Sequence, residues 1–431
     1  MHKAIQKLSR KSLEALIEAF EYISSPLNPD EILKLVLEQI SNLLNAEAGS
    51  IFLINEKTKM LELKVATNLN SDEIEKIKVP IGKGLAGYVA GHDVLVNIKD
   101  VEKDDRFYSN IDSITGFKTK NILTVPLKTS QKLVGVIQAL NKKNGENFSE
   151  EDEILLTEFS RLVGLTLEKA WFLSQLIEKQ TIEADLEIAS KIQESLLPKH
   201  ELRIDDNLVK GYYKPAKYIS GDYYDFFVLN DDEILIVLGD VAGKGAQASL
   251  IMASVKAYLS AAIESHLNFT TISNNLNKFL AQNTPNDKFI TIFLGLINLK
   301  ENKITYINSG HEPGIILTQE GKLIYLHSNN IMMGVLEDFE YIPTEQEFPK
   351  NSFLFIYTDG VTEANNKEDN RFGNERLIEL IFKNSKSPLN IFDELPQAII
   401  EFANGKEQFD DITFLMVVRG NYLINPKSSV N

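Results

Sequence analysis

A single uninterrupted helical pattern constrains this chain more than any other feature of its sequence. Between Ser149 and Pro198 there is no proline and no glycine-rich break, apart from Gly164. This stretch of roughly 48 residues far exceeds the ~8–20 residues of an ordinary globular helix. Such a length favours a coiled coil or an interdomain shaft. We therefore expect folded regions on both sides of a helical linker over residues 151–198.

The hydrophobic repeat within this helix is imperfect. One seam, which we call the heptad seam, has the alternating spacing of four and three residues at Ile182, Leu186, Ala189 and Leu196. Gln193 interrupts it. A second partial seam consists of Leu162, Leu165, Phe172 and Leu176. Lys169 occupies a position in it that should be apolar. The pattern predicts a dimerisation helix with an adjustable register, or alternatively a helix packed on its own domains.

The bulk composition excludes several functional classes. The chain of 431 residues contains no cysteine, which removes disulfides, thiolate nucleophiles and cysteine metal sites. Its net charge of −16 argues against nucleic-acid binding, because a polyanion would be repelled at long range. No apolar stretch approaches the ~18 residues that span a bilayer, and the N-terminal MHKAIQKLSRKS lacks the apolar segment of a signal peptide. We expect a cytoplasmic protein.

Helix and strand patterns alternate before the long helix. An amphipathic helix is expected over residues 1–24, and a break at Ser25 and Pro26 follows it. Two helices are predicted at 29–45 and 81–90. Four strands are predicted at 49–55, 60–68, 121–128 and 132–142, and a loop is predicted at 97–107. This order predicts one compact α/β domain of sensor size over residues 25–150.

Strand patterns dominate after Pro198. Two helices interrupt them at about 245–266 and 270–282, two more lie within 374–404, and a final strand, ITFLMVV, closes the region. Many strands around two helical excursions predict a β-sandwich flanked by helices. We place this domain at residues 199–420, with a tail at 421–431.

Four aspartates in this second region share one local context. Each lies at a strand end or in a turn with small neighbours: Asp222, Asp240, Asp359 and Asp410. A carboxylate beside a buried strand is costly unless it is paired or coordinates a cation. One shared cluster of Mg²⁺ or Mn²⁺, which prefer oxygen ligands, would accommodate all four carboxylates. Asp225 is expected to be a solvated neighbour, and His311 is the only histidine beside a glycine turn.

The stretch GDVAGKGAQASL, residues 239–250, also raises the alternative of a phosphate-binding loop. A Walker loop needs a lysine followed by serine or threonine, whereas here Lys244 precedes Gly245 and Ala246. The dinucleotide fingerprint fails as well, because its third glycine is missing. The pattern therefore disfavours both nucleotide alternatives.

Seven segments in order resemble the catalytic domain of PPM-type serine/threonine phosphatases of the bacterial sporulation and stress-response branch (SpoIIE/RsbU-like). They are ADLEIASKIQESLLP, KPAKYISGDYYDFF, LGDVAGKGAQASLIMA, TIFLGLINL, YINSGHEPGIIL, LFIYTDGVTEANN with RFGNERL, and FDDITFLMV. The resemblance covers residues ~180–420 and implies an α-β-β-α sandwich fold. It also implies hydrolysis of phosphoserine or phosphothreonine in a protein.

The resemblance implies a site for two Mn²⁺ or Mg²⁺ ions. By motif, Asp240 would bridge both ions and the Val241 backbone carbonyl would be a further ligand. Asp222 would bind one ion, and Asp359 and Asp410 would complete the other. Asp411 would hydrogen-bond nearby backbone instead. The phosphate-binding arginine of eukaryotic members has no counterpart just before Asp222, and only Lys214 and Lys217 could replace it.

Residues 25–150 resemble a GAF sensor domain. The resemblance rests on IGKGLAGYVA, NIKDVEKDDRF and ILTVPLKTSQKLVGVIQALNK. Asn141, Lys142, Phe148, Asp152 and Glu153 also fit a signature of cyclic-nucleotide-binding members. A structural role is the alternative, because carboxylates in a first helical turn favour the helix dipole and Lys142 could pair with Asp152. The ligand is a cyclic nucleotide, another small molecule, or none, with only protein contacts.

Together these observations predict a metal-dependent phosphoprotein phosphatase regulated by a GAF sensor through a long helix. The resemblance suggests a phosphorylated anti-sigma-factor antagonist as its target in bacterial signalling, and the helix suggests a homodimer. One alternative is a non-catalytic signalling adaptor that keeps the phosphatase fold. A metal-dependent nucleotide cyclase is disfavoured, because the carboxylates follow the phosphatase order.

Overall fold

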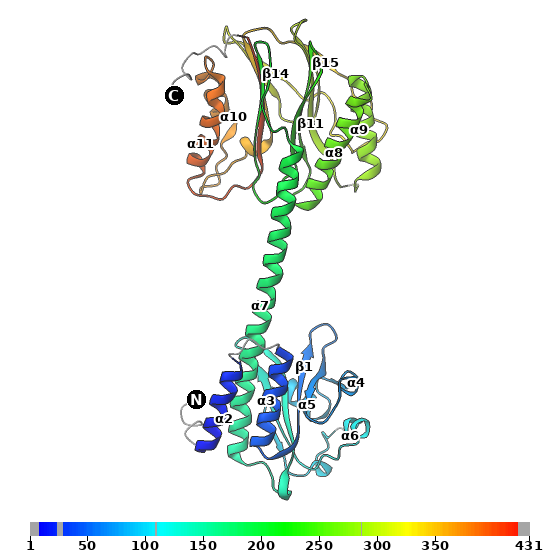
Figure 1. Ribbon diagram of the computed structural model, residues 1–431, viewed down its shortest axis with the longest axis vertical. Coiled ribbons are helices and arrows are strands. Elements are labelled where there is room, and N and C mark those ends of the chain that lie inside the picture. Colours follow the sequence, from blue (N-terminus) through cyan, green and yellow to red (C-terminus); the bar gives the residue numbers. More distant parts are fainter. Residues whose placement is uncertain (1–7, 24–28, 108–109, 286, 421–431) are drawn as a thin grey trace. The chain divides into compact units, whose positions relative to one another are not determined.

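The computed structural model describes residues 8–23, 29–107, 110–285 and 287–420. The chain divides into two compact units, residues 1–180 and 181–431, which are described separately (Figure 1). The predicted break at Ser25 and Pro26 and the predicted tail at 421–431 lie outside the described residues. So does the start of the first predicted helix.

The first unit is built on one antiparallel sheet with the strand order β3-β2-β1-β6-β5-β4. Its strands are β1 (Ala46–Asn55), β2 (Met60–Ala66), β3 (Lys78–Pro80), β4 (Val96–Ile98), β5 (Ile122–Lys128) and β6 (Leu133–Lys142). Its helices are α2 (Arg10–Ile23), α3 (Pro29–Leu43), α4 (Ser71–Ile74), α5 (Gly84–His92), α6 (Asn110–Thr115) and the first part of α7 (Glu150–Leu196). The strand segments predicted from the alternating pattern all form.

Helices α3 and α7 cover one face of this sheet. In α3, apolar residues at helical spacing are buried, including Leu33, Val36 and Ile40. In α7, Phe159 and Val163 join the same core. Gly164 explains how the helix approaches so closely, since a Cβ there would lie 1.8 Å from the Lys128 carbonyl oxygen. The opposite face packs against α5 through a separate core.

The second unit consists of two antiparallel sheets. The five-stranded sheet has the order β15-β12-β11-β10-β9, and the six-stranded sheet has the order β14-β13-β16-β17-β8-β7. The strands are β7 (Leu202–Ile204), β8 (Asn207–Lys214), β9 (Asp222–Asn230), β10 (Glu233–Val241), β11 (Ile290–Asn298), β12 (Lys303–Ser309), β13 (Gly314–Thr318), β14 (Leu323–Leu326), β15 (Thr344–Glu347), β16 (Ser352–Tyr357) and β17 (Ile412–Arg419). A core of aliphatic and aromatic side chains lies between the sheets.

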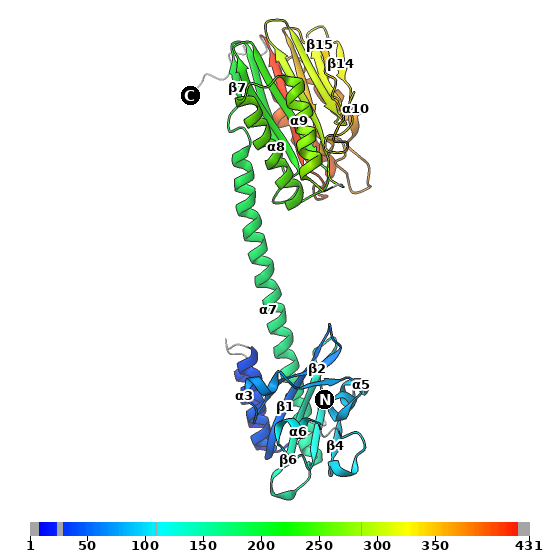
Figure 2. The ribbon, with the colours of Figure 1, turned by 90° about the vertical axis from the view of Figure 1, so that its right-hand side faces the viewer.

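Two pairs of helices cover the outer faces of these sheets. Helices α8 (Ala246–Glu264) and α9 (Phe269–Asn283) lie on the five-stranded sheet (Figure 2). Helices α10 (Gly373–Lys383) and α11 (Ile391–Ala403) pack on the six-stranded sheet through a second core. The prediction of a mixed α/β chain with a helix-flanked sandwich is confirmed.

Helix α8 corrects one expectation about apolar segments. Among the described residues it is the one helix that is long and apolar enough, by length and composition, to cross a membrane. Its side chains Met252, Val255 and Leu259 are fully buried in the core of the second unit. One face of this helix therefore packs into the core of the second unit.

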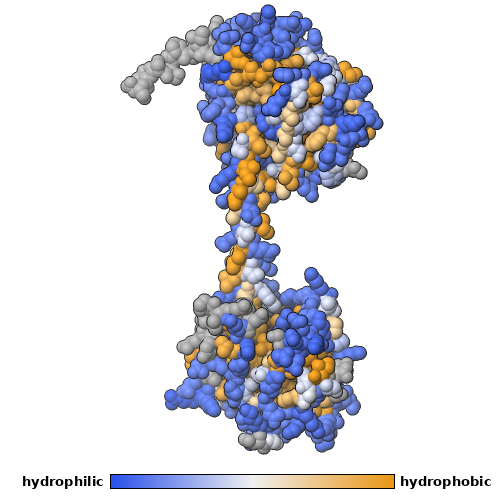
Figure 3. Space-filling model, turned by 45° about the vertical axis from the view of Figure 1, so that its right-hand side comes forward, coloured by the Kyte–Doolittle hydropathy of each residue, from blue (hydrophilic) through white to orange (hydrophobic). Residues whose placement is uncertain are grey.

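The predicted long helix is present as α7, which is 47 residues long. Its sequence carries an unusual number of large apolar side chains that are exposed (Figure 3). They are Leu165, Trp171, Phe172, Leu173, Leu176, Ile177, Ile182, Ile188 and Ile192. The heptad seam shares only Ile182 with these positions, because Leu186, Ala189 and Leu196 are partly buried and Gln193 is buried. The end of that seam packs against the chain's own second unit.

Candidate functional site

Two of the predicted aspartates lie directly opposite each other. Strands β9 and β10 pair so that Asp240 faces Asp222 across the ladder. Directly opposite residues in an antiparallel pair have Cβ atoms ~5 Å apart. Both strands are rich in β-branched and aromatic residues, and this composition makes their ends part of the buried interior. Asp222 is only 2% exposed.

The remaining aspartates come from the second sheet. Asp359 begins a short 3-10 helix, Asp359–Val361, directly after β16, and Asp410 and Asp411 directly precede β17. Because β16 and β17 are neighbours in the sheet, these side chains emerge at one edge. The Thr358 hydroxyl donates a hydrogen bond of 2.9 Å to Asp222 Oδ2, which joins the two sheets at this edge. We call Asp222, Asp240, Asp359, Asp410 and Asp411 the acidic site.

Asp411 makes the backbone hydrogen bonds expected of it. Its Oδ1 accepts from Ala216 N at 2.7 Å, and its Oδ2 accepts from Gly221 N at 3.2 Å. The carboxylate therefore anchors the loop that leads into β9. This anchoring fixes the position of Asp222 at the start of that strand.

Burial and neighbouring charges raise the pKa of three carboxylates of the acidic site. Burial, followed by the charges of Asp359 and Asp410, raises the pKa of Asp240 to about 8. Burial, followed by the charge of Asp240, raises the pKa of Asp222 well above its ordinary value. The pKa of Asp359 is raised by burial and by Asp410. Such mutual repulsion is relieved by a bound cation or a proton.

Asp410 forms an ion pair with Lys244, for which the sequence motifs predicted no partner. Lys244 Nζ lies 2.8 Å from Asp410 Oδ2 and 2.8 Å from the Phe409 carbonyl oxygen. The same ammonium lies 3.9 Å from the centroid of the Phe409 ring. Across the described ranges, no group of three or more histidine, aspartate or glutamate side chains is gathered as a ready-made metal site. The predicted ligands are neighbours, but Asp410 is engaged by Lys244.

The donor set nevertheless suits hard divalent cations. All candidate ligands are oxygen atoms, which Mg²⁺ and Mn²⁺ prefer. Gly221 leaves space at the Val241 carbonyl, since a Cβ on Gly221 would lie 3.0 Å from that oxygen and 3.5 Å from Asp240 Oδ1. Gly360 is required for a different reason, because its Cβ would lie 1.9 Å from the Asp411 carbonyl oxygen. The residues present therefore fit the cations that the resemblance implies.

Asp225 differs from expectation. It is 3% exposed and accepts a hydrogen bond of 2.6 Å from the Tyr223 hydroxyl. It also forms an ion pair with Lys256 of α8. A buried carboxylate with these partners is a structural link between β9 and α8, so its predicted solvation was wrong.

His311 lies near the acidic site as part of its scaffold. It is buried, and burial lowers its pKa to about 4. Its Nδ1 lies 3.1 Å from the Thr291 hydroxyl, and its backbone N–H donates to Asn308. A neutral imidazole in this position supports the ends of β11 and β12.

One buried residue that interrupted the heptad seam connects α7 to the acidic site. Gln193 Nε2 donates to the Ser220 carbonyl oxygen at 2.7 Å, and Ser220 N donates to Gln193 Oε1 at 3.0 Å. The Tyr213 hydroxyl also donates to Oε1, at 3.2 Å. Ser220 Oγ in turn accepts from Asp222 N at 2.9 Å. The sequence pattern identified Gln193 only as an interruption of the heptad seam.

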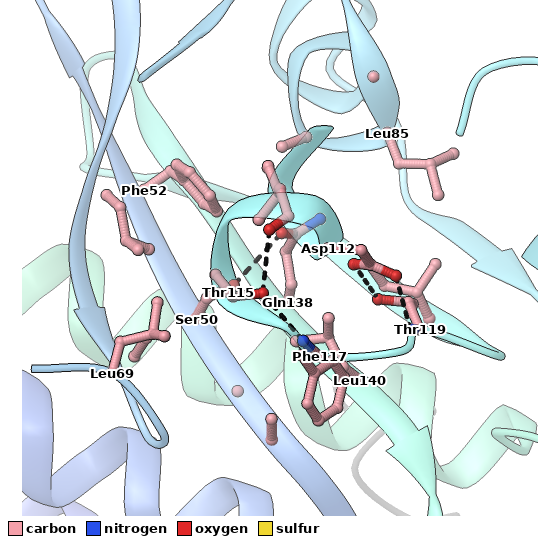
Figure 4. Close-up of a pocket in the computed structure, with 18 of the residues that line it drawn as sticks. Ser50, Phe52, Leu69, Leu85, Asp112, Thr115, Phe117, Thr119, Gln138 and Leu140 are labelled. Atoms are coloured by element: carbon pink, nitrogen blue, oxygen red, sulfur yellow. Dashed lines mark hydrogen bonds between the residues drawn. The ribbon is translucent and has the colours of Figure 1, made fainter. Parts of the chain in front are cut away.

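The first unit contains a cavity of about 240 Å³ between the sheet and the segment around α5 and α6. Its lining is largely apolar, and the polar groups in it are mostly satisfied by each other (Figure 4). Asp112 accepts from Thr119 N at 2.7 Å and from its hydroxyl at 2.8 Å. Gln138 accepts from Ser50 at 3.2 Å. No lysine, arginine or histidine is among the described residues that line it.

The residues of the cyclic-nucleotide signature have structural partners. Asn141, with a φ of 54°, donates to Glu47 Oε2 at 2.8 Å and to the Lys118 carbonyl oxygen at 2.9 Å. Lys142 forms the expected ion pair with Asp152. None of the three lines the cavity. The motif therefore holds β6 to the start of α7.

Comparison with known families agrees with both units. Residues 28–167 match the GAF domain family, and residues 230–420 match Stage II sporulation protein E (SpoIIE). The solved SiaA-PP2C domain of Pseudomonas aeruginosa has the fold of the second unit, with a TM-score of 0.50, 20% identity, and coverage of 57% of this chain and 99% of that one. The chain is a multidomain protein in which a GAF domain precedes a SpoIIE/PP2C-type phosphatase domain.

Two curated relatives illustrate the similarity. The chain is 31% identical over 222 residues to phosphoserine phosphatase RsbU of Bacillus subtilis, a match that covers 50% of this chain and 66% of RsbU. It is 29% identical over 274 residues to protein IcfG of Synechocystis, with coverage of 57% of this chain and 43% of IcfG. The matches thus span less than two thirds of either relative's length.

Proposed function

We propose that this chain is a Mn²⁺- or Mg²⁺-dependent serine/threonine phosphoprotein phosphatase regulated by its GAF domain. The observation that carries the proposal is the pairing of Asp222 with Asp240 at the edge where Asp359 and Asp410 emerge from the other sheet. The similarity to a phosphoserine phosphatase supports the same reaction. We also propose a cytoplasmic location from the composition, and the resemblance suggests a phosphorylated anti-sigma-factor antagonist as substrate.

Some residues of the acidic site would bind the ions, and others position the carboxylates that bind them. Asp240, the Val241 carbonyl and Asp222 would hold one ion, and Asp240 with Asp359 and Asp410 would hold a second. Two such ions, when bound, lower the pKa of water and polarise a phosphoryl group. Thr358 orients the Asp222 carboxylate, and Asp411 holds the loop before it. No protein nucleophile is needed.

The experiment that tests this function is hydrolysis of para-nitrophenyl phosphate in the presence of Mn²⁺. Asp240→Asn should abolish turnover, and EDTA should abolish it reversibly, because both treatments remove a cation from the acidic site. Asp232→Asn, at an exposed turn, is the matched control and should retain activity. Full activity in Asp240→Asn, or in the presence of excess EDTA, would refute the proposed mechanism.

A second candidate is a non-catalytic adaptor that keeps the phosphatase fold. The observation that favours it is the ion pair between Lys244 and Asp410, which occupies one predicted ligand. In that case the wild-type chain would bind Mn²⁺ weakly and leave para-nitrophenyl phosphate intact.

The cavity in the GAF domain supports a role as a ligand sensor. Its volume of about 240 Å³ and its apolar lining suit a small molecule. A cyclic nucleotide and an uncharged ligand are the candidates. The absence of cationic side chains from the described lining favours the uncharged ligand, since a phosphate there would lack an ion-pair partner. Calorimetric titration with cyclic AMP, cyclic GMP and uncharged aromatic probes distinguishes them.

The exposed apolar residues of α7 support a homodimer. Leu173, Ala184, Ile188 and Ile192 lie on one side of the helix, since they recur with the spacings of an 11-residue repeat. Such a repeat favours a nearly straight or slightly right-handed pair of helices. This surface differs from the heptad seam, whose C-terminal part packs within the chain. A second copy of α7 would bury the side chains that are now exposed.

A further inference from the structure

A second cavity, of about 160 Å³, lies beside the acidic site and has no role in the proposed chemistry. One wall is formed by the side of α11 that carries Ile399, Ile400 and Ala403. The other wall comes from the loop before β17, including Phe409 and Asp410. Gly360, the neighbour of Asp359, also lines it. Whatever occupies this cavity therefore lies next to the predicted ligands.

Apolar and polar side chains both line the cavity. Ala364, Pro396 and Ile412 add apolar surface to the two walls, and Lys214, Lys406 and Glu407 add charged groups. This combination suits an apolar side chain carried on a polar backbone.

The rim of the cavity is apolar and fixed to the acidic site. Ile400 is 50% exposed and Phe409 is 66% exposed, although both are large apolar residues. The ring of Phe409 lies against the Lys244 ammonium, which is itself bound to Asp410. Both exposed side chains therefore offer apolar surface to an occupant beside the acidic site.

We propose that this cavity is a substrate subsite, which receives an apolar side chain close in sequence to the phosphorylated serine or threonine. The inference rests on the proposed phosphatase function. An extended polypeptide presents alternating side chains and free backbone N–H groups. Such a chain can place one side chain against the wall that Ile399, Ile400 and Ala403 form. A cavity of ~150 Å³ accommodates a group the size of benzene, so one leucine or phenylalanine side chain fits against the apolar wall.

The test uses short phosphoserine peptides in which leucine replaces alanine at one position at a time on either side of the phosphoserine. Peptide binding is measured by fluorescence anisotropy without metal, and kcat/KM by phosphate release with Mn²⁺. Leucine at one fixed position should improve both by about tenfold, the effect of burying one such side chain. A flat profile across all positions would overturn the subsite.

Variants connect that preference to this cavity. Ile400→Glu and Ala403→Phe should each abolish the leucine preference and leave hydrolysis of para-nitrophenyl phosphate unchanged. Ile342→Glu, at another exposed isoleucine of the same unit (71% exposed), is the control and should keep the preference. Retention of the preference in both cavity variants would overturn the proposal. If the wild type hydrolyses neither substrate but still binds the leucine peptide better, the phosphatase function fails and the subsite stands.

Discussion

The hydrogen bonds of Gln193 predict that α7 controls the local stability of the acidic site. Replacing Gln193 with leucine introduces an apolar side chain of similar size and removes all three hydrogen bonds. The Ser220 N–H and C=O groups would then be buried without partners. Each such group costs ~1–3 kcal/mol, so the segment that leads to Asp222 should lose about 2–6 kcal/mol of stability.

Hydrogen exchange read by mass spectrometry measures this loss where it occurs. A loss of 2 kcal/mol corresponds to about 30-fold faster exchange, since every 1.4 kcal/mol is tenfold. The peptide containing Ser220 and Asp222 should show at least that acceleration, and Mn²⁺ should bind the variant more weakly. Gln175→Leu, at an exposed position of the same helix, should change neither quantity. Exchange within twofold of the wild type in Gln193→Leu would refute the proposed coupling.

Three further predictions concern charge and assembly. Burial raises the pKa of Asp240 to about 8, so protonated Asp240 should stabilise the metal-free protein fully below pH ~4. This contribution to the free energy of unfolding should be lost as the pH rises through 8. Urea unfolding of Asp240→Asn without metal should lack this loss. Lys244→Met should bind Mn²⁺ several-fold more tightly by calorimetry, since Asp410 is released from its ion pair; equal or weaker binding would contradict this role. Ile188→Glu combined with Ile192→Glu should convert a dimer to a monomer in light scattering, and an unchanged mass would exclude this helix face as the interface.

Local sequence patterns determined the elements and the candidate ligands. A helical pattern without proline from 149 to 197 permits one long helix, because propagation adds a hydrogen bond with every residue. The strand pattern that begins at Asp222 and the apolar run that leads into Asp240 identify strand ends with a carboxylate. The expected pair of Lys142 with Asp152 also follows from local reasoning, because a strand end and a first helical turn are neighbours in sequence.

The roles of other polar residues depended on contacts between distant segments. In the sequence, Gln193 only interrupts a repeat, whereas in the structure it hydrogen-bonds to Ser220. Asp225 is predicted to be solvated, whereas in the structure it pairs with Lys256. Neither partner can be deduced from spacing, because the packing of α7 and α8 on the sheets decides which polar groups lose water. The same packing decided that Lys244 reaches Asp410.

The sequence alone therefore determined which residues carry negative charge at strand ends and where the helices run. Only the tertiary structure decided which of those charges face each other, which are neutralised by lysine, and where cavities remain. The physical reason is that hydrogen bonding and burial within an element depend on nearby residues, whereas the pKa of a carboxylate and the volume of a cavity depend on every segment that surrounds it.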